Sequence, residues 1–316
     1  MDRLRKWRSR RKSTVIVAQK GHNSLEDPPP RYETDLSPPA ADPSASHYGI
    51  KVLHADPSAV VDICFIHGLT GDREKTWTAH GHSTPWPQSL LPSRLPARIL
   101  TYGYNAHITQ KSVASSNRLI NHAQNLLTDL SADRGFEGAV DRPLIFVVHS
   151  LGGLVCKKAI LLSQNAAEPK SRSIFDCLKG VVFMGTPHRG AWMADWAKTP
   201  ASALGLVKST NVMLLDILQR DNQLLDSIQV DFLTMIRRLR ESGRRVEISC
   251  FYEELPFPVV GKIVNEQSAT LDGFDAVSIY ANHRDMVRFA SDEDPGFRRV
   301  LWQLHDWTSQ ISTGEF

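Results

Sequence analysis

The stretch LIFVVHSLGGLVCKKAI (Leu144–Ile160) decides the fold of this chain. Residues 144–148 are apolar and rich in β-branched side chains, which predicts a buried strand, and the residues from 154 onward have the apolar spacing of a helix. Ser150 therefore stands at a strand-to-helix turn, where a serine is held in a strained conformation with its hydroxyl above the sheet. We expect the two glycines that follow to let the helix pack closely against that sheet.

The motif around Ser150 departs from the G-x-S-x-G pattern at one position, because Val148 occupies the place of the first glycine. We expect the turn to be slightly more open for that reason. Serine is also a favoured N-cap residue, so this motif alone leaves a purely structural role for Ser150 open.

A second predicted strand end carries residues suited to the same chemistry. Residues 60–66 form an apolar strand that leads into His67-Gly68-Leu69. The N–H of Leu69 would lie over the carboxyl edge of the sheet and, with the N–H of Leu151, would form a two-donor oxyanion hole. We interpret His67 as a buried structural histidine that hydrogen-bonds this loop.

Strand-like and helix-like segments alternate along the chain from about residue 48 onward. Apolar strands separated by helices are typical of a mostly parallel sheet with helices on both faces. We therefore predict an α/β fold with a doubly wound sheet, which binds ligands at the carboxyl ends of its strands. The predicted strands are 50–53, 60–66, 98–102, 144–148, 181–184, 246–251 and 276–280, with an eighth candidate at 259–264. The predicted helices are 115–130, 154–163, several within 193–239, and 296–309.

The first 46 residues differ in composition from the rest of the chain. Residues 1–20 carry eight lysines and arginines against one aspartate, and residues 27–46 are rich in proline. We predict a disordered, basic and Pro-rich segment over residues 1–46 and a folded α/β domain over residues 47–316. The basic segment also suits an anionic membrane surface or, as a third interpretation, a mitochondrial presequence.

Composition excludes several classes of protein. No apolar run reaches the roughly 20 residues of a membrane-spanning helix, and no apolar region of a secretory signal follows the basic residues. The net charge of +3 is too near balance to indicate nucleic-acid binding by the chain as a whole. The four cysteines lack C-x-x-C spacing, which favours free thiols in a reducing compartment over a zinc site. We predict a cytoplasmic protein, membrane-associated through its basic segment, with the mitochondrion as the alternative and without a metal site.

Five motifs follow one another along the chain: FIHGLTGDREKTW (65–77), ARILTYGYNA (97–106), FVVHSLGGLVCKKAI (146–160), VVFMGTPHRG (181–190) and ANHRDMVRF (281–289). Together they resemble the lipase-like α/β-hydrolases, in particular the serine-active-site-containing proteins and their fungal relatives, which are akin to GPI inositol-deacylases. The resemblance runs from about residue 51 to about residue 307. It implies an α/β-hydrolase fold, an acyl-serine mechanism and no cofactor, but no particular substrate. The family's serine and histidine motifs fall on Ser150 and His283.

A nucleophilic serine needs a base, and histidine suits that role because its reference pKa lies near 6.5. In this fold the chain order is serine, acid, histidine, so the base is expected late in the sequence. His283 follows the last predicted strand and precedes the closing helix, whereas His305 lies within that helix, where a packed or surface role is expected. We predict His283 as the base.

The acid is expected at the carboxyl end of the strand 246–251, where Glu253 and Glu254 stand. Because side chains alternate along a strand, only one of the two can face His283. We predict Glu253, which resembles the family's strand-end glutamate, with Glu254 as the alternative acid. The other late acidic residues are less well placed, because they precede a strand, follow the eighth candidate strand or come after the histidine: Asp272, Asp275, Glu266 and Asp285.

These residues predict a serine hydrolase that cleaves a carboxylic ester, in the manner of a lipase or esterase of lipid metabolism. An acyltransferase, or a cyclase or thioesterase of a biosynthetic pathway, would use the same triad, and a non-catalytic signalling or binding module on the same fold is a further alternative. A helical insertion over about residues 191–243 carries an apolar stripe, which indicates either core packing or a lid that lines an acyl pocket. With the basic segment, a lid would favour a small-molecule or lipid ester as substrate.

Overall fold

The computed structural model describes residues 47–68, 71–105, 115–188, 222–257 and 261–315, all within the single compact unit 42–316. The predicted N-terminal segment 1–46 lies outside the described residues. The strands are β1 (Gly49–His54), β2 (Val61–Ile66), β3 (Ala97–Gly103), β4 (Leu144–His149), β5 (Leu178–Met184), β6 (Glu247–Glu253) and β7 (Ala276–Ile279). The helices are α1 (Trp86–Ser89), α2 (Ser115–Phe136), α3 (Gly152–Gln164), α4 (Pro169–Asp176), α7 (Asn222–Glu241), α8 (Glu266–Ala269) and α9 (Pro295–Thr313), with a short 3-10 turn at Lys75–Trp77.

The described strands form one sheet in the order β1-β3-β2-β4-β5-β6-β7. Strand β1 runs antiparallel to β3, and the remaining neighbours pair in parallel. This arrangement confirms the predicted α/β-hydrolase fold. The chain passes from β2 to β3 on one side and then returns to β4 on the other, so the strand order reverses beside β2. In such sheets ligands bind at the carboxyl ends of the strands at this point of reversal.

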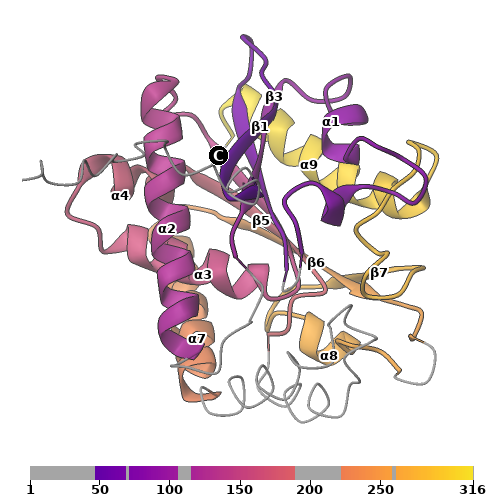
Figure 1. Ribbon diagram of the computed structural model, residues 1–316. Coiled ribbons are helices and arrows are strands. Elements are labelled where there is room, and N and C mark those ends of the chain that lie inside the picture. The colour runs from indigo at the N-terminus through magenta and orange to yellow at the C-terminus, as the bar shows by residue number, and fades with distance from the viewer. Residues whose placement is uncertain (1–46, 69–70, 106–114, 189–221, 258–260, 316) are drawn as a thin grey trace, which may run out of the picture. The chain divides into compact units, whose positions relative to one another are not determined.

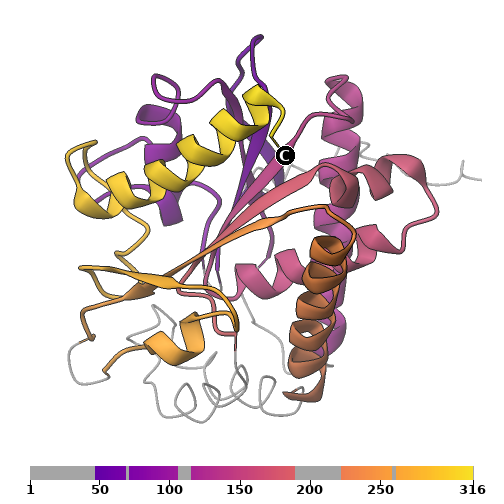
Figure 2. The ribbon, with the colours of Figure 1, turned by 180° about the vertical axis from the view of Figure 1, so that it is seen from behind.

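Helices cover both faces of the sheet, as Figures 1 and 2 show from opposite sides. Helices α2, α3 and α7 lie on one face, and α1 and α9 lie on the other. Each face has its own apolar core, one containing Ile160 of α3 and Phe232 of α7, the other containing Trp86 of α1 and Trp307 of α9. Because β2 and β4 are buried along their whole length, their residues are apolar on both faces except for Asp62 and His149.

The eighth candidate strand is wrong for residues 261–264, which belong to no strand of the sheet. Gly261 forms an isolated bridge to Phe257, and the chain then continues as an irregular segment in which Ile263 and Val264 are buried. A short apolar run is ambiguous by its pattern alone. Here the two residues are buried outside the sheet, and their backbone N–H groups bind a side chain instead of a neighbouring strand, as described below.

A buried ion cluster stands at the amino end of the sheet, opposite the carboxyl ends of the strands. Asp62 of β2 is fully buried and accepts hydrogen bonds from three arginines. Arg98 of β3 donates from Nε and Nη2 to both carboxylate oxygens, each at 3.0 Å. Arg134 of α2 and Arg142 donate at 2.6 and 2.9 Å, and Asp133 pairs with Arg98 from the other side. The cluster joins α2 to the two strands that lead toward the candidate site.

Replacing Asp62 by asparagine is expected to lower the free energy of unfolding by about 3–5 kcal/mol, because it leaves buried guanidinium groups without their shared carboxylate. Urea unfolding followed by circular dichroism measures the loss. Asp226→Asn, at an exposed position of α7, is the matched control and should change stability by less than about 0.5 kcal/mol. Equal effects of the two substitutions would show that the cluster contributes little.

Candidate active site

Ser150 occupies the turn between β4 and α3 in a conformation that few residues adopt. Its φ of 54° makes it the one non-glycine residue with positive φ in the described part of the chain. Its N–H donates to the carbonyl of Met184 at the end of the neighbouring strand β5, at 2.9 Å. Left-handed backbone costs energy in a residue that has a Cβ, and such strain collects at functional sites. The turn therefore has the backbone geometry expected of a nucleophile between a strand and a helix.

Glycines on three sides let the surrounding backbone approach this turn. A Cβ on Gly68, in the loop after β2, would lie 2.7 Å from the Cβ of Ser150. A Cβ on Gly152 would overlap the carbonyl of His67, and one on Gly153 would overlap the side chain of Thr186. Larger residues at these positions would push α3 away from the sheet, so the predicted close packing of this helix depends on the glycines.

The loop after β2 is anchored by His67, which is buried and stacks on Tyr104 with ring centroids 4.4 Å apart. Nδ1 of His67 donates to the carbonyl of Gly68, and Nε2 accepts from the N–H of Tyr104 at 3.3 Å. Both nitrogens are thus engaged by backbone, which is the structural role expected for this histidine. Leu69, the first predicted oxyanion donor, lies outside the described residues. Leu151, the second, directly follows Ser150 and is the N-cap of α3, where helix N–H groups favour negative charge.

His283 and Glu253 lie together in the interior. Nδ1 of His283, in the loop between β7 and α9, is 2.7 Å from Oε2 of Glu253, the last residue of β6, and both side chains are buried. Glu254 is exposed, and its N–H donates to the carbonyl of Ile279. Of the two glutamates at this strand end, the structure brings Glu253 to the histidine and turns Glu254 toward solvent.

The second oxygen of Glu253 is held by backbone. Oε1 accepts hydrogen bonds from the N–H groups of Ile263 and Val264, the latter at 3.1 Å. These two residues lie in the irregular segment where a strand was a candidate, and no sequence signal indicated that they bind a carboxylate. Because two backbone N–H groups hold Oε1, Oε2 is directed at the imidazole. The carboxylate therefore fixes the orientation of the His283 ring, with Nδ1 facing Glu253.

The ring of His283 has further neighbours that restrict it. Gly185, which has a φ of 58°, lies so close that a Cβ there would be 2.9 Å from Cε1 of the imidazole. The ring of His149 lies 4.9 Å away, and its Nε2 donates to the carbonyl of His283 at 2.9 Å. Burial, together with the neighbouring His283, lowers the pKa of His149 well below its usual value, so His149 stays a neutral donor. Sequence reasoning missed this role, because it depends on a contact 134 residues away along the chain.

The remaining nitrogen of His283 is free to act. Nε2 is buried and makes no hydrogen bond to any described residue, Ser150 included. Ser150 and the histidine are nevertheless joined by neighbours, because Met184 binds the N–H of Ser150 while the next residue, Gly185, packs on the imidazole. The arrangement thus contains a serine on strained backbone, an imidazole whose Nε2 makes no described hydrogen bond, and a carboxylate beside the Nδ1 of that imidazole.

The other late acidic and histidine residues lie elsewhere. Asp285 pairs with the exposed His80 at 3.0 Å and accepts a hydrogen bond from Asn282. His305 is exposed on α9. No group of three potential metal ligands occurs within the described ranges.

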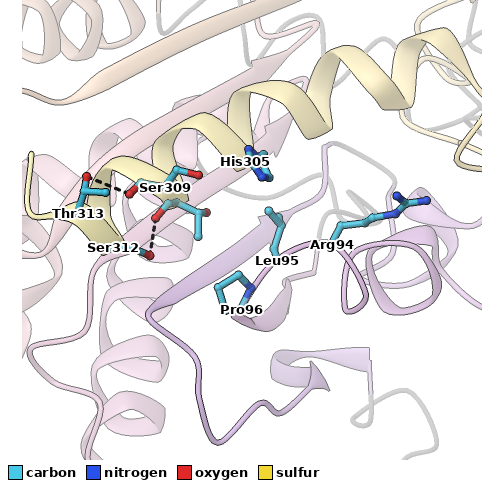
Figure 3. Close-up of a pocket in the computed structure, with 8 residues that line it drawn as sticks. Arg94, Leu95, Pro96, His305, Ser309, Ser312 and Thr313 are labelled. Carbon is cyan, nitrogen blue, oxygen red and sulfur yellow. Dashed lines mark hydrogen bonds between the residues drawn. The ribbon is translucent and has the colours of Figure 1, made fainter.

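His305 lines a pocket of about 290 Å³ between the C-terminal half of α9 and residues 94–96, which precede β3 (Figure 3). This pocket lies at the amino end of β3, away from Ser150 and His283. The hydroxyls of Thr308 and Ser312 on its helical wall donate to carbonyls of α9 itself. The pocket therefore has few polar groups free to bind a ligand and does not belong to the candidate site.

The predicted insertion 191–243 is described only from residue 222 onward, and its earlier part lies outside the described residues. In the described part, Ile228, Phe232 and Ile236 of α7 are buried in the core beside α3. Core packing thus explains the apolar stripe of α7. For residues 191–221, which lie outside the described residues, the lid interpretation stays a prediction.

The chain is similar in sequence to protein SERAC1 of cattle (Bos taurus), with 25% identity over 292 residues that cover 84% of this chain and 42% of that protein. Protein SERAC1 of zebrafish (Danio rerio) is 26% identical over 288 residues, which cover 82% of this chain and 41% of that protein. The chain thus spans about two fifths of the length of the curated relatives that it matches. No protein-family model matches it.

Among solved structures, the chain resembles Bacillus licheniformis lipase BlEst2, with a TM-score of 0.49 and 15% identity over 79% of this chain and 95% of that one. It also resembles esterase B from Lactobacillus rhamnosis, with a TM-score of 0.45 and 11% identity over 83% of this chain and 80% of that one. The sequence matches and the strand order of the sheet make this chain a SERAC1-like protein on an α/β-hydrolase fold.

Proposed function

We propose that this protein is a serine hydrolase that cleaves a carboxylic ester through an acyl-serine intermediate. The observation that carries the proposal is the strained backbone of Ser150 at the carboxyl end of β4, in a sheet whose same edge holds the buried His283–Glu253 pair. A serine that served only as a helix cap would not need a positive φ, because capping residues have extended backbone. Strain of this kind is instead expected of a nucleophile.

In the proposed reaction, Oγ of Ser150 attacks the ester carbonyl while Nε2 of His283 takes the hydroxyl proton. The carbonyl oxygen becomes an oxyanion, for which the N–H groups of Leu69 and Leu151 are the proposed donors. The imidazolium then protonates the leaving alcohol, and the carbonyl re-forms as an acyl-serine. Water attacks this ester with His283 again as the base, which releases the carboxylic acid and restores Ser150. Glu253 stabilises the imidazolium and does not itself take the proton.

The proposed substrate is a lipid-like or other acyl ester. The apolar residues within 193–221 and the basic N-terminal residues support this class of substrate, because the first suit an acyl chain and the second an anionic lipid surface. Among the described residues, no helix has the length and the apolar character needed to cross a bilayer.

The test combines covalent labelling with a substrate series. A fluorophosphonate probe is expected to add one adduct to the folded protein, and mass spectrometry of the digested protein should locate it on the peptide that contains Ser150. The kcat/KM for p-nitrophenyl ester hydrolysis should then be higher for acyl chains of eight or more carbons than for acetate. Heat-denatured protein is the control for labelling.

Three outcomes of this test are informative. An absence of both adduct and ester hydrolysis would contradict the proposed activity and would favour the non-catalytic module. Labelling with acyl transfer to an added alcohol in place of hydrolysis would indicate an acyltransferase or cyclase. Hydrolysis without any preference for longer chains would contradict the lipid-like substrate while leaving the esterase chemistry intact.

A further inference from the structure

Lys157, in α3, is fully buried, which is rare for a lysine. Its Nζ lies 2.6 Å from Nδ1 of His188 and donates to Oε1 of Gln229. It also lies over two aromatic rings, 5.0 Å from the centroid of Phe183 and 5.5 Å from that of Phe232. These described contacts include no carboxylate, and burial lowers the pKa of Lys157 to about 7. A methionine of similar length would fill this space without desolvating an amine, so the polar contacts call for an explanation.

Lys157 and its partner His188 together connect four elements of the fold. The residue itself belongs to α3, the helix that begins two residues after Ser150. His188 follows β5, and Gln229 lies in α7. Nε2 of His188 lies 3.9 Å from Sγ of Cys250 in β6, the strand that ends at the candidate acid. Lys157 thus ties the helix behind the nucleophile to the turn after β5.

That turn, residues 185–188, touches the imidazole of the candidate acid–base pair and the helix that follows the segment binding its carboxylate. At its start, Gly185 packs against the imidazole of His283. At its end, the N–H of His188 donates to the carbonyl of Ser268 in α8, at 2.6 Å. Helix α8 begins two residues after Val264, whose N–H holds the carboxylate of Glu253. A displacement of the turn would therefore be felt by the imidazole and by the segment that binds its carboxylate.

We propose that Lys157 is a positioning residue of the candidate active site, which holds the turn 185–188 through His188 and so keeps His283 and Glu253 aligned with Ser150. The inference rests on the proposed function, because alignment matters only if these three residues react. Lys157 has no described contact with any of the three and acts through the turn. Orientation of catalytic groups affects the rate of the chemical step more than substrate affinity, so kcat is the parameter that should respond.

The first test compares Lys157→Met with Lys158→Met, which removes the neighbouring and partly exposed lysine of the same helix. Lys157→Met is expected to lower kcat for p-nitrophenyl ester hydrolysis at least tenfold, with KM within about twofold of wild type. Lys158→Met should leave both constants within about twofold. Circular dichroism confirms that each variant is folded before its kinetics are measured. If the two folded variants have the same kcat, the positioning role is overturned.

A second pair of variants tests the same contact from its other end and serves if Lys157→Met does not fold. In His188→Asn the amide oxygen stands near the place of Nδ1 and can still accept from Lys157, whereas His188→Leu offers no acceptor. We expect His188→Leu to lose at least tenfold in kcat and His188→Asn to stay within about threefold of wild type. Equal losses in both variants would contradict a role for the hydrogen bond.

A measurement without substrate separates this inference from the proposed function. Hydrogen exchange of the full chain, read by mass spectrometry, is expected to be at least tenfold faster over residues 185–188 and 263–268 in Lys157→Met than in Lys158→Met. If Lys157→Met exchanges faster while the wild-type protein does not hydrolyse esters, Lys157 holds the turn but the proposed reaction is wrong. Unchanged exchange together with normal hydrolysis in Lys157→Met would overturn the positioning role and leave the proposed reaction standing.

Discussion

Replacing Ser150 by alanine is expected to lower kcat for ester hydrolysis by about 10⁶-fold, because the proposed reaction has no other nucleophile. The remaining rate would come from binding and from the oxyanion donors alone. Steady-state hydrolysis of a p-nitrophenyl ester measures the loss, and the fluorophosphonate adduct should disappear with it. A variant that retains one tenth of the wild-type kcat would exclude Ser150 as the nucleophile.

Two control variants separate chemistry from folding in this experiment. Ser227→Ala removes an exposed hydroxyl of α7 whose described hydrogen bond, to the carbonyl of Leu224, lies within its own helix, and it should retain wild-type activity. Ser150→Gly should be as inactive as Ser150→Ala. Its free energy of unfolding should exceed that of the wild-type protein by about 1 kcal/mol, because glycine adopts a positive φ without steric cost. A rise in stability together with a loss of activity would show that the strained backbone of Ser150 lowers the stability of the wild-type protein.

Replacing Glu253 by glutamine is expected to lower kcat by about 10⁴-fold while KM changes little. The amide oxygen of glutamine would accept from the N–H groups of Ile263 and Val264, as Oε1 of Glu253 does, so that its NH₂ group faces Nδ1 of His283. Nδ1 must then accept a hydrogen bond, which places the imidazole proton on Nε2. In that tautomer His283 cannot take the proton of Ser150.

Glu254→Gln is the matched control, since this carboxylate is exposed and one position further along the chain. It should keep kcat within about twofold of wild type. Because the substitution at position 253 preserves shape and hydrogen bonds, the melting temperature of both variants should stay close to that of wild type. A large loss in Glu254→Gln together with a normal Glu253→Gln would show that the acid has been assigned to the wrong residue.

Local patterns in the sequence were enough to predict the parts of this protein that depend on neighbouring residues. The apolar run 144–148, the serine after it and the glycine pair at 152–153 predict a strand, a strained turn and a closely packed helix. These features arise from side-chain spacing and backbone freedom within a few residues. The same reasoning over successive segments predicts the parallel sheet, and the strand order confirms it.

Only the tertiary structure decided which distant groups meet. Alternation allowed one glutamate of the pair 253–254 to face His283, but the irregular segment that clamps Glu253 came from a run that looked like a strand. The hydrogen-bond partners of Asp62 and of Lys157 likewise lie 31 to 80 residues away along the chain. Such contacts are set by how helices, strands and loops pack against one another, and no periodicity within a segment carries that information. Backbone preferences act locally, whereas the positions of buried charges and of the base depend on the whole packed fold.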